Sequence, residues 1–218
     1  MKEYQKIPGP FRRETEGPRR NRVIEGQWIS PELEYLANVD WVWTEKVDGT
    51  NIRIHWDGHK VTYGGRTDNA QLPAKLLPML DALVPEELFE QQFGGDGATL
   101  YGEGYGAGIQ KGGNYRPDMS FVLFDVQVGD WWLRRPQMLE VAQGMGLQTA
   151  PMILQAPIRA AIEVVRSGLT STWNPAVRAE GLVGTTLVGL VDRSGQRLMV
   201  KVKAADFPGG NEQLEKVP

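Results

Sequence analysis

Lys46 is the residue of this chain whose surroundings most suggest chemistry. Residues 45–51 read EKVDGTN, between an apolar run, WVWT, and an alternating run, IRIHW. The lysine therefore stands where a strand is expected to end, and an acid and a glycine follow it closely. A lysine is a poor nucleophile at its ordinary pKa of about 10.4, so it must be desolvated or placed near other cations before it can attack. Taken alone, the stretch favours an ordinary charged turn.

Two further lysines stand close together near the end of the chain. Lys201 and Lys203 are two residues apart in LMVKVKAADF, so on a strand both side chains face the same side. They form either a solvated strand face, which the spacing alone slightly favours, or a clamp for a polyanion such as a triphosphate. Other charged residues on predicted strands, or at their ends, are Asp48, Glu103, Asp125 and Glu180.

Several common kinds of site are not indicated by the sequence. The chain has no cysteine, which excludes disulfides and cysteine-ligated zinc. His55 and His59 have no carboxylate triad beside them and do not indicate zinc, and the alternation around His55 predicts that it faces solvent. The run YGEGYGAGIQKGGNY (101–115) has neither the dinucleotide-binding nor the phosphate-loop spacing. Glu103 stands among these glycines, where the sugar of a ligand could approach the backbone.

The composition is that of an ordinary globular chain. Its 218 residues, 41% hydrophobic and 23% charged, suffice for one large domain or two small ones. No apolar run reaches the ~20 residues that span a bilayer, and the polar N-terminus lacks the apolar core of a secretion signal, so we expect a cytoplasmic protein with no membrane partner. The net charge of −3 provides no global attraction to nucleic acid. One basic cluster, either a solvated segment or a local phosphate contact, comprises Arg12, Arg13, Arg19, Arg20 and Arg22.

The predicted strands come as hairpins with helices between them, which indicates an α+β fold of largely antiparallel sheets. Hairpin turns are predicted at DGH (57–59) and DRSGQ (192–196). Three tryptophans, Trp41, Trp43 and Trp56, are predicted to lie in the core. Helices are expected at 30–37, at 72–94 with breaks at Pro78 and Pro85, at 135–146 and at 157–168, and strands at 41–47, 50–66, 98–106, 120–135, 180–192 and 197–207.

Two regions are predicted along the chain. Residues 1–26 are rich in Pro, Gly and charge, and we expect a basic N-terminal arm with little regular structure. No segment within 27–207 has the composition of an interdomain linker, so residues 27–218 are expected to form one domain.

Six short motifs, taken in order, resemble those of the covalent nucleotidyltransferase superfamily, which comprises ATP-dependent RNA and DNA ligases and mRNA capping enzymes. EKVDGTN resembles its K-x-D-G nucleophile motif, and GGRTDN supplies a downstream arginine, Arg66, twenty residues after Lys46. Four further segments of the chain resemble later motifs of the superfamily: YGEGYG, FVLFDV, EGLVG and VKVK. The likeness therefore runs from residue 45 to residue 203. A single K-x-D-G would be weak evidence, whereas six motifs in the right order are strong evidence.

Within that superfamily the chain is most similar to the RNA ligase 2-like group, which includes phage end-joining and RNA-editing ligases. The likeness rests on KVDGTN together with YGEGYGAGIQKG, and the pair Thr50-Asn51 favours RNA ligases over DNA ligases. The resemblance implies an ATP-dependent RNA ligase of a phage or its host that acts in RNA repair. It also implies a nucleotidyltransferase fold, an ATP-grasp-like adenylation domain of antiparallel sheets flanked by helices, with the nucleotide pocket between the sheets.

The resemblance further implies a role for each motif residue. Lys46 would attack the α-phosphate of ATP and form a lysyl-AMP adduct, which passes AMP to an RNA 5′-phosphate before a 3′-hydroxyl displaces it. Lys201 and Lys203 would activate the nucleophile and neutralise phosphates, and a divalent cation, Mg²⁺ or Mn²⁺, would lie near Glu180 and Asp125. The remaining roles are Glu103 at the ribose, Phe124 on adenine with Phe121 as second choice, Glu45 at adenine, Arg66 at a phosphate or the RNA terminus, and Asn51 at the 5′-phosphate end.

The sequence differs from many relatives at its C-terminal end. Only about fifteen residues follow Lys203, whereas many relatives carry a further C-terminal domain. We therefore expect a nucleotidyltransferase domain alone, and a partner protein could supply the missing domain. The alternatives are a small ATP-dependent DNA-nick ligase and a non-sealing module of the same fold that binds nucleotide or RNA.

Overall fold

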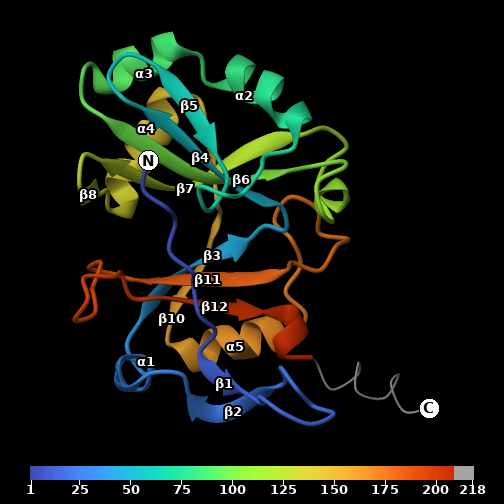
Figure 1. Cartoon of the computed structure of the whole chain (residues 1–218). Helices are drawn as coiled ribbons and strands as arrows, with labels where there is room; N and C mark the ends of the chain where they lie inside the picture. The colour runs from blue at the N-terminus through green and yellow to red at the C-terminus, as the bar shows by residue number, and fades with distance from the viewer. Residues whose placement is uncertain (209–218) are drawn as a thin grey trace. The chain divides into compact units, whose positions relative to one another are not determined.

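The computed structural model describes residues 1–208, and these divide into two compact units (Figure 1). Unit 1 comprises Met1–Tyr4 and Val47–Ala150. Unit 2 comprises Gln5–Lys46 and, among the described residues, 151–208. Within residues 27–207 the chain passes from one unit to the other at Lys46–Val47 and at Ala150–Pro151, next to the ends of strands and without a linker, which is why the composition there showed no boundary.

Unit 1 is built on a six-stranded sheet with the order β5-β4-β6-β7-β8, in which β9 pairs with β7. All its pairings are antiparallel except that of β9 with β7. The strands are β4 (Thr50–Trp56), β5 (Val61–Gly64), β6 (Ala98–Tyr105), β7 (Ser120–Val128), β8 (Trp131–Trp132) and β9 (Gln148–Thr149).

The helices of unit 1 pack on one face of this sheet. Alternation along β4 turns Ile52, Ile54 and Trp56 toward them, and these side chains form one core with Leu80 and Phe89. The other face carries polar and aromatic side chains and is called here the polar face of unit 1. Its members are Asn51, Arg53, His55, Thr99, Tyr101, Glu103, Asp125 and Gln127. The helices on the other face are α2 (Leu77–Leu83), α3 (Glu86–Phe93) and α4 (Arg135–Gly144), and unit 1 also has short 3₁₀ turns at Ala74–Leu76 and Gly112–Asn114.

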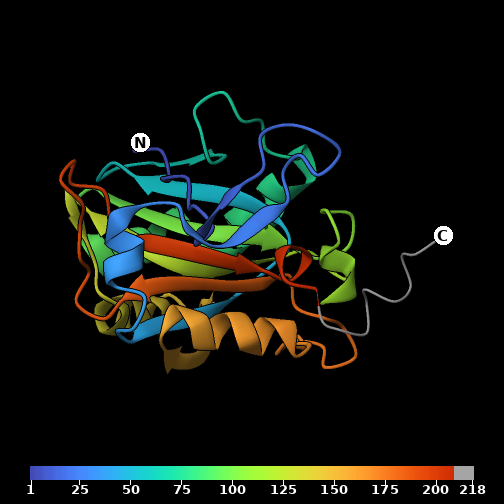
Figure 2. The same cartoon turned by 90° about the horizontal axis from the view of Figure 1, so that it is seen from below.

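Unit 2 is built on a four-stranded antiparallel sheet with the order β10-β3-β11-β12. Figure 2 shows α5 running along one face of it. Trp41 and Trp43 of β3 are fully buried in one core with Ile158 and Ile162 of α5. The elements are α1 (Pro31–Tyr35), β3 (Trp41–Lys46), β10 (Met152–Ala156), α5 (Ile158–Arg166), β11 (Gly181–Thr186), β12 (Met199–Lys203), a 3₁₀ turn at Ala204–Asp206, and the separate hairpin of β1 (Phe11–Arg13) and β2 (Val23–Trp28).

Most sequence expectations about the fold are confirmed. The fold is α+β with largely antiparallel sheets, and Trp41, Trp43 and Trp56 are buried. Ser30 caps α1 by accepting a hydrogen bond from the Leu33 backbone, with Pro31 at the start of the helix. The turn at 57–59 closes the β4–β5 hairpin, because the Asp57 carboxylate accepts the backbone N–H groups of His59 and Lys60.

Two expectations about local structure were wrong. Residues 1–26 are not an arm with little regular structure, because they contain β1 and most of β2, and Phe11 packs on Trp28. Strand β10 was missed, since its sequence MILQA shows no clear alternation. The domain predicted over 27–218 includes residues 209–218, which lie outside the described residues.

The helices of residues 1–208 are all too short or too polar to cross a membrane.

The packing of α5 on the unit 2 sheet can be tested by truncating one buried side chain. Ile162→Ala removes buried methyl groups and leaves a cavity, so we expect the free energy of unfolding to fall by about 2–4 kcal/mol. The exposed neighbour Ala160 provides the control, since Ala160→Ser should change the same quantity by no more than about 0.5 kcal/mol. Urea unfolding measures both, and equal effects would show that α5 does not pack as described.

Candidate active site

Lys46 and two other charged side chains form an ion cluster in unit 2. Lys46 is the last residue of β3, and its Nζ donates to Glu180 Oε2 at 2.6 Å. The other carboxylate oxygen, Oε1, lies 2.9 Å from Lys203 Nζ. One carboxylate therefore bridges two ammonium groups, and its side chain is only 17% exposed. Partial burial strengthens such an interaction relative to a surface ion pair.

The strand register explains why these residues meet. Gly181 of β11 pairs with Lys46 on one side and with Lys203 on the other, which sets Glu180 beside both lysines. Gly181 has a φ of +151°, and an added Cβ would lie 2.0 Å from the Val202 carbonyl oxygen. Glycine is therefore required for β11 and β12 to approach this closely. The structure thus explains the Glu-Gly pair of EGLVG: Glu180 binds the two lysines, and Gly181 allows the strands to approach.

Lys201 adds a third positive charge to the cluster. Lys201 and Lys203 lie on one side of β12, while Val200 and Val202 point into the core, so the expectation that the two lysines share a face is confirmed. Burial lowers the pKa of Lys201, and the nearby charges of Lys46 and Lys203 lower it further, while Glu180 acts in the opposite direction. Three positively charged side chains therefore lie close to one another in this cluster, and such an arrangement suits the binding of a polyanion.

Glu45 points to the opposite face of β3 from Lys46. It lies on the same face of β3 as Trp43 and is only 2% exposed. Its Oε2 accepts the backbone N–H of Thr172 at 2.8 Å, and its Oε1 has no hydrogen-bond partner among residues 1–208. A buried carboxylate oxygen without a donor is costly, so Glu45 has unused capacity to accept a hydrogen bond.

In unit 1, Asn51 and Glu103 lie opposite each other on β4 and β6. Both belong to the polar face, and Asn51 Oδ1 is buried with no hydrogen-bond partner within the described chain. Gly49 lies just before β4, where an added Cβ would be 2.3 Å from the Gly104 carbonyl oxygen. The glycine of the K-x-D-G motif is therefore needed for close contact with β6.

Phe124 and Asp125 lie in β7, at an irregularity in its pairing with β6. Tyr101 pairs with Asp125 and Gly102 with Leu123, so Phe124 is the extra residue of a bulge. Its ring lies 5.1 Å from the ring of Tyr4, and the Tyr4 hydroxyl donates to Asp125 Oδ2 at 2.8 Å. Phe121, the second choice for a stacking residue, is instead buried in the core of unit 1.

Three polar residues of unit 1 differ from what the sequence indicated. Tyr4 and Arg53 were not identified, although both make buried polar contacts. The alternation around Arg53 placed it on the face opposite the core, but no sequence signal showed that N-terminal residues would cover it. His55 was expected to face solvent, yet it is half-buried, bonds the Thr99 hydroxyl at 2.9 Å, and has a pKa lowered by burial.

Arg66 lies in the loop after β5, with an exposed side chain. Its backbone carbonyl accepts the Tyr4 N–H at 3.2 Å. The structure thus brings together Lys46, Glu180, Lys201 and Lys203 in unit 2, and places Asn51, Glu103, Phe124, Asp125 and Arg66 in unit 1.

No group of three or more His, Cys, Asp or Glu side chains within residues 1–208 could hold a metal ion alone. Glu180 belongs to unit 2 and Asp125 to unit 1, where Asp125 is bonded to Tyr4. Mg²⁺ is usually held by one or two carboxylates together with substrate phosphates and water, so such an ion does not require a group of three protein ligands. The assignment of Glu180 and Asp125 as metal ligands stays a prediction.

The RNA ligase family profile matches residues 39–203, which is most of the chain and includes all six motifs. The fold is that of the nucleotidyltransferase domain of RNA ligases. The chain belongs to the RNA ligase family.

Solved structures of Naegleria gruberi RNA ligase have this fold. A lysine-to-alanine variant with ATP and Mn is 18% identical with a TM-score of 0.62, and covers 85% of this chain and 53% of its own. The enzyme with pyrophosphate is 19% identical with a TM-score of 0.61, covering 85% and 54%. An aspartate-to-alanine variant without ligand is 16% identical with a TM-score of 0.63, covering 85% and 55%. This chain therefore spans about half the length of those proteins, and no curated protein sequence matches it.

If the lysines of the cluster repel one another, removing one lysine and removing the carboxylate should change the thermal stability in opposite directions. Lys201→Met removes a repelled ammonium group and should raise the thermal midpoint by about 1–3 °C. Glu180→Gln leaves Lys46 and Lys203 without their shared carboxylate and should lower the thermal midpoint by about 2–6 °C. The pKa of Lys201 is lowered in the folded state, so the folded protein gives up this proton more readily and the penalty fades as the pH rises toward 10.5. Calorimetry at pH 7 and pH 9.5 should therefore show a smaller gain from Lys201→Met at the higher pH, and a loss of stability at both would contradict this account.

Proposed function

We propose that this protein is an ATP-dependent RNA ligase that works through a covalent lysyl-AMP adduct on Lys46. The observation that carries the proposal is the cluster in which Lys46 ends β3, with Glu180 2.6 Å away and Lys203 bonded to the same carboxylate. Membership of the RNA ligase family supports it. The solved relatives bound to ATP and Mn or to pyrophosphate support a nucleotide substrate.

In the first step, the lone pair of the unprotonated Lys46 amine attacks the α-phosphorus of ATP. A phosphorus–nitrogen bond forms, the bond to the β-phosphate oxygen breaks, and pyrophosphate leaves with the electron pair. The proton that Lys46 loses passes to solvent. Glu180 holds Lys46 in place beforehand as an ion pair. An ammonium group has no lone pair, so Lys46 must lose one proton before it can attack phosphorus.

Lys201 and Lys203 would bind the phosphates. Their charges face one side of β12. Burial lowers the pKa of Lys201, and repulsion by Lys46 and Lys203 lowers it further; a polyanion that binds among them would relieve that repulsion. Charge stabilisation of this kind is commonly worth a factor of about 10²–10³ in rate for a single donor. Glu180 and Asp125 would be the protein's ligands to Mg²⁺ or Mn²⁺. Such an ion, when bound, neutralises phosphate charge and orients the leaving group.

The adenosine would be recognised by residues with unused acceptors or exposed ring surface. Glu45 Oε1 is buried without a hydrogen-bond partner in the described chain, so it could accept from the adenine amine. Glu103 would bind ribose hydroxyls. Phe124, which is half-buried and lies against the ring of Tyr4, would stack on adenine.

The RNA ends would be handled by Arg66 and Asn51. Arg66 is exposed and could bind phosphate bidentately, and Asn51 has a buried oxygen without a partner in the described part of the chain. AMP passes from Lys46 to an RNA 5′-phosphate, which breaks the phosphorus–nitrogen bond and forms a pyrophosphate linkage. The 3′-hydroxyl of the other end then attacks that 5′-phosphate and releases AMP.

The proposed nucleophile predicts a labelled protein. Incubation with α-labelled ATP and Mg²⁺ or Mn²⁺ should give an acid-labile adduct, because the phosphorus–nitrogen bond hydrolyses in acid. Lys46→Ala should abolish the label, whereas the exposed control Lys60→Ala should keep it. Label that persists in Lys46→Ala would refute the assignment. Labelling by GTP alone would instead indicate a capping-type enzyme, and no adduct with either nucleotide would remove the enzyme proposal.

The substrate is tested by comparing nicks that contain RNA with nicks made only of DNA. An RNA ligase should seal the RNA-containing nick at least about 10-fold faster, because a 2′-hydroxyl is what lets a protein tell RNA from DNA at a given site. Equal or faster sealing of DNA would favour a DNA-nick ligase. An adduct without sealing of any substrate would favour a module that needs a partner protein or a further domain.

We also propose that the β1–β2 hairpin contacts the RNA backbone. It precedes residue 39, where the family match begins, and its connecting loop carries three exposed arginines. Arg13 is already paired with Asp206, whereas Arg19, Arg20 and Arg22 form no ion pair within residues 1–208.

The hairpin predicts a change in salt dependence. Each phosphate contact that is lost should reduce the magnitude of the slope of log affinity against log salt by about 0.7–0.9, so replacing all three loop arginines by glutamine should reduce it by about 2–3. Arg20→Gln and the exposed control Arg193→Gln each remove one charge, and only the former should change the slope. Unchanged affinity and slope in the triple variant would show that the hairpin does not bind RNA.

A further inference from the structure

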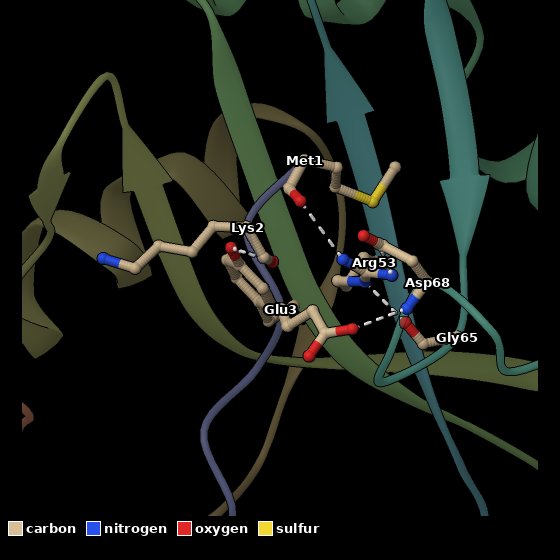
Figure 3. A network of polar contacts seen from close by, with 7 residues as sticks. Met1, Lys2, Glu3, Arg53, Gly65 and Asp68 are labelled. Carbon is tan, nitrogen blue, oxygen red and sulfur yellow. Dashed lines mark hydrogen bonds and ion pairs between the residues drawn. The ribbon is translucent and has the colours of Figure 1, made fainter.

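Arg53 is a fully buried arginine in the middle of β4. Its neighbours Ile52 and Ile54 point into the core, so Arg53 points to the polar face of unit 1, where its side chain is 1% exposed. Figure 3 shows its guanidinium surrounded by Met1, Gly65 and Asp68. Nε donates to the Gly65 carbonyl, Nη1 to the Met1 carbonyl at 3.3 Å, and Nη2 to Asp68 Oδ1 at 2.8 Å.

This arrangement is a poor source of stability. Taking a guanidinium out of water costs several kcal/mol, and a buried ion pair often repays no more than an apolar side chain of similar size would. The carboxylate that faces Arg53 belongs to Asp68, whose side chain is 72% exposed, so solvent screens the pair. The value of Arg53 therefore has to be sought in what its hydrogen bonds hold in place.

The hydrogen bonds hold the loop that carries Arg66. Arg53 binds Gly65 on one side of Arg66 and Asp68 on the other. Two contacts from the N-terminal residues add to these bonds, and the hydrogen bonds of Arg53, Glu3 and Tyr4 with residues 65–68 are together called the brace here. The Arg66 carbonyl accepts the Tyr4 N–H at 3.2 Å. Glu3 Oε1 accepts the Asp68 N–H at 2.8 Å (Figure 3). The backbone of residues 65–68 is thus fixed at three of its four positions.

The Arg66 side chain itself is left exposed at the surface of this braced loop. No ion pair of its guanidinium occurs among residues 1–208. A loop that must order itself around a ligand loses roughly 1–2 kcal/mol per residue in backbone entropy, and ordering it beforehand removes that cost from binding. A fixed backbone with an unpaired guanidinium is what a preorganised phosphate site requires.

We propose that Arg53 is a positioning residue that fixes the 65–68 loop so that Arg66 can bind a phosphate group. The inference deepens the proposed function and rests on it for the identity of the phosphate, which belongs either to ATP or to the RNA 5′ end. The N-terminal residues Glu3 and Tyr4 are part of the same brace. Arg53 itself touches neither substrate.

The first test measures the brace without any catalysis. In the full chain, Arg53→Met keeps most of the side-chain volume and removes every donor. Hydrogen exchange of the backbone amides in residues 65–70 should become at least about 10-fold faster, while exchange in β6 stays the same. Unchanged exchange in the loop would overturn the proposal. Should Arg53→Met fail to fold, Asp68→Leu alters an exposed side chain and removes one bond of the brace. Its matched control, Asp68→Asn, keeps an oxygen for Nη2.

The second test is a double-mutant cycle with Arg66→Ala. Arg53→Met should slow one step by about 10-fold, either adduct formation or AMP transfer to RNA, and which step it is identifies the phosphate. In the Arg66→Ala background the same change should cost less than about 2-fold, because the loop no longer carries a guanidinium to position. A general loss of stability would reduce the rate equally in both backgrounds and would refute a positioning role. If the unaltered protein forms no adduct, the proposed function fails, while hydrogen exchange still decides whether the brace exists.

Discussion

The structure of the site depends on one carboxylate that bridges two lysines. Glu180 lies between the ends of β3 and β12 and binds both Lys46 and Lys203. Without it, three ammonium groups would crowd together with no opposite charge beside them. Burial lowers the pKa of Lys201, and the charges of Lys46 and Lys203 lower it further even with Glu180 in place. A protein gains little stability from such a cluster, which suits one that binds a polyanion and has to accept an unfavourable arrangement until that ligand arrives.

The antiparallel pairing of β3, β11 and β12 is what makes this cluster possible. Gly181 pairs with Lys46 and Lys203 at once, and a side chain there would clash with β12. A glycine has the same role in unit 1, where Gly49 allows close contact with β6 next to the pair formed by Asn51 and Glu103. Gly181 and Gly49 thus each allow two backbone segments to lie close together, and each lies next to a polar residue at a strand end.

The sequence predicted best where local spacing determines geometry. Alternation placed Lys201 and Lys203 on one side of β12, and turn chemistry placed the β4–β5 hairpin. It predicted least where partners are distant, as for Tyr4, whose hydroxyl binds a carboxylate 121 residues away. Arg53 shows the same limit, because alternation identifies its face but not the N-terminal residues that bury it. Residues 1–26 were misjudged since their polar composition outweighed the apolar contact of Phe11 with Trp28.

The most direct measurement is the mass of the peptide that contains Lys46 after incubation of the protein with ATP and a divalent cation. The account predicts that this peptide gains one AMP, that fragmentation places the group on the lysine, and that added pyrophosphate removes it, because the step is reversible. An AMP group on any other residue, or a modified Lys46 peptide that pyrophosphate does not restore, would contradict the central claim that Lys46 is the nucleophile.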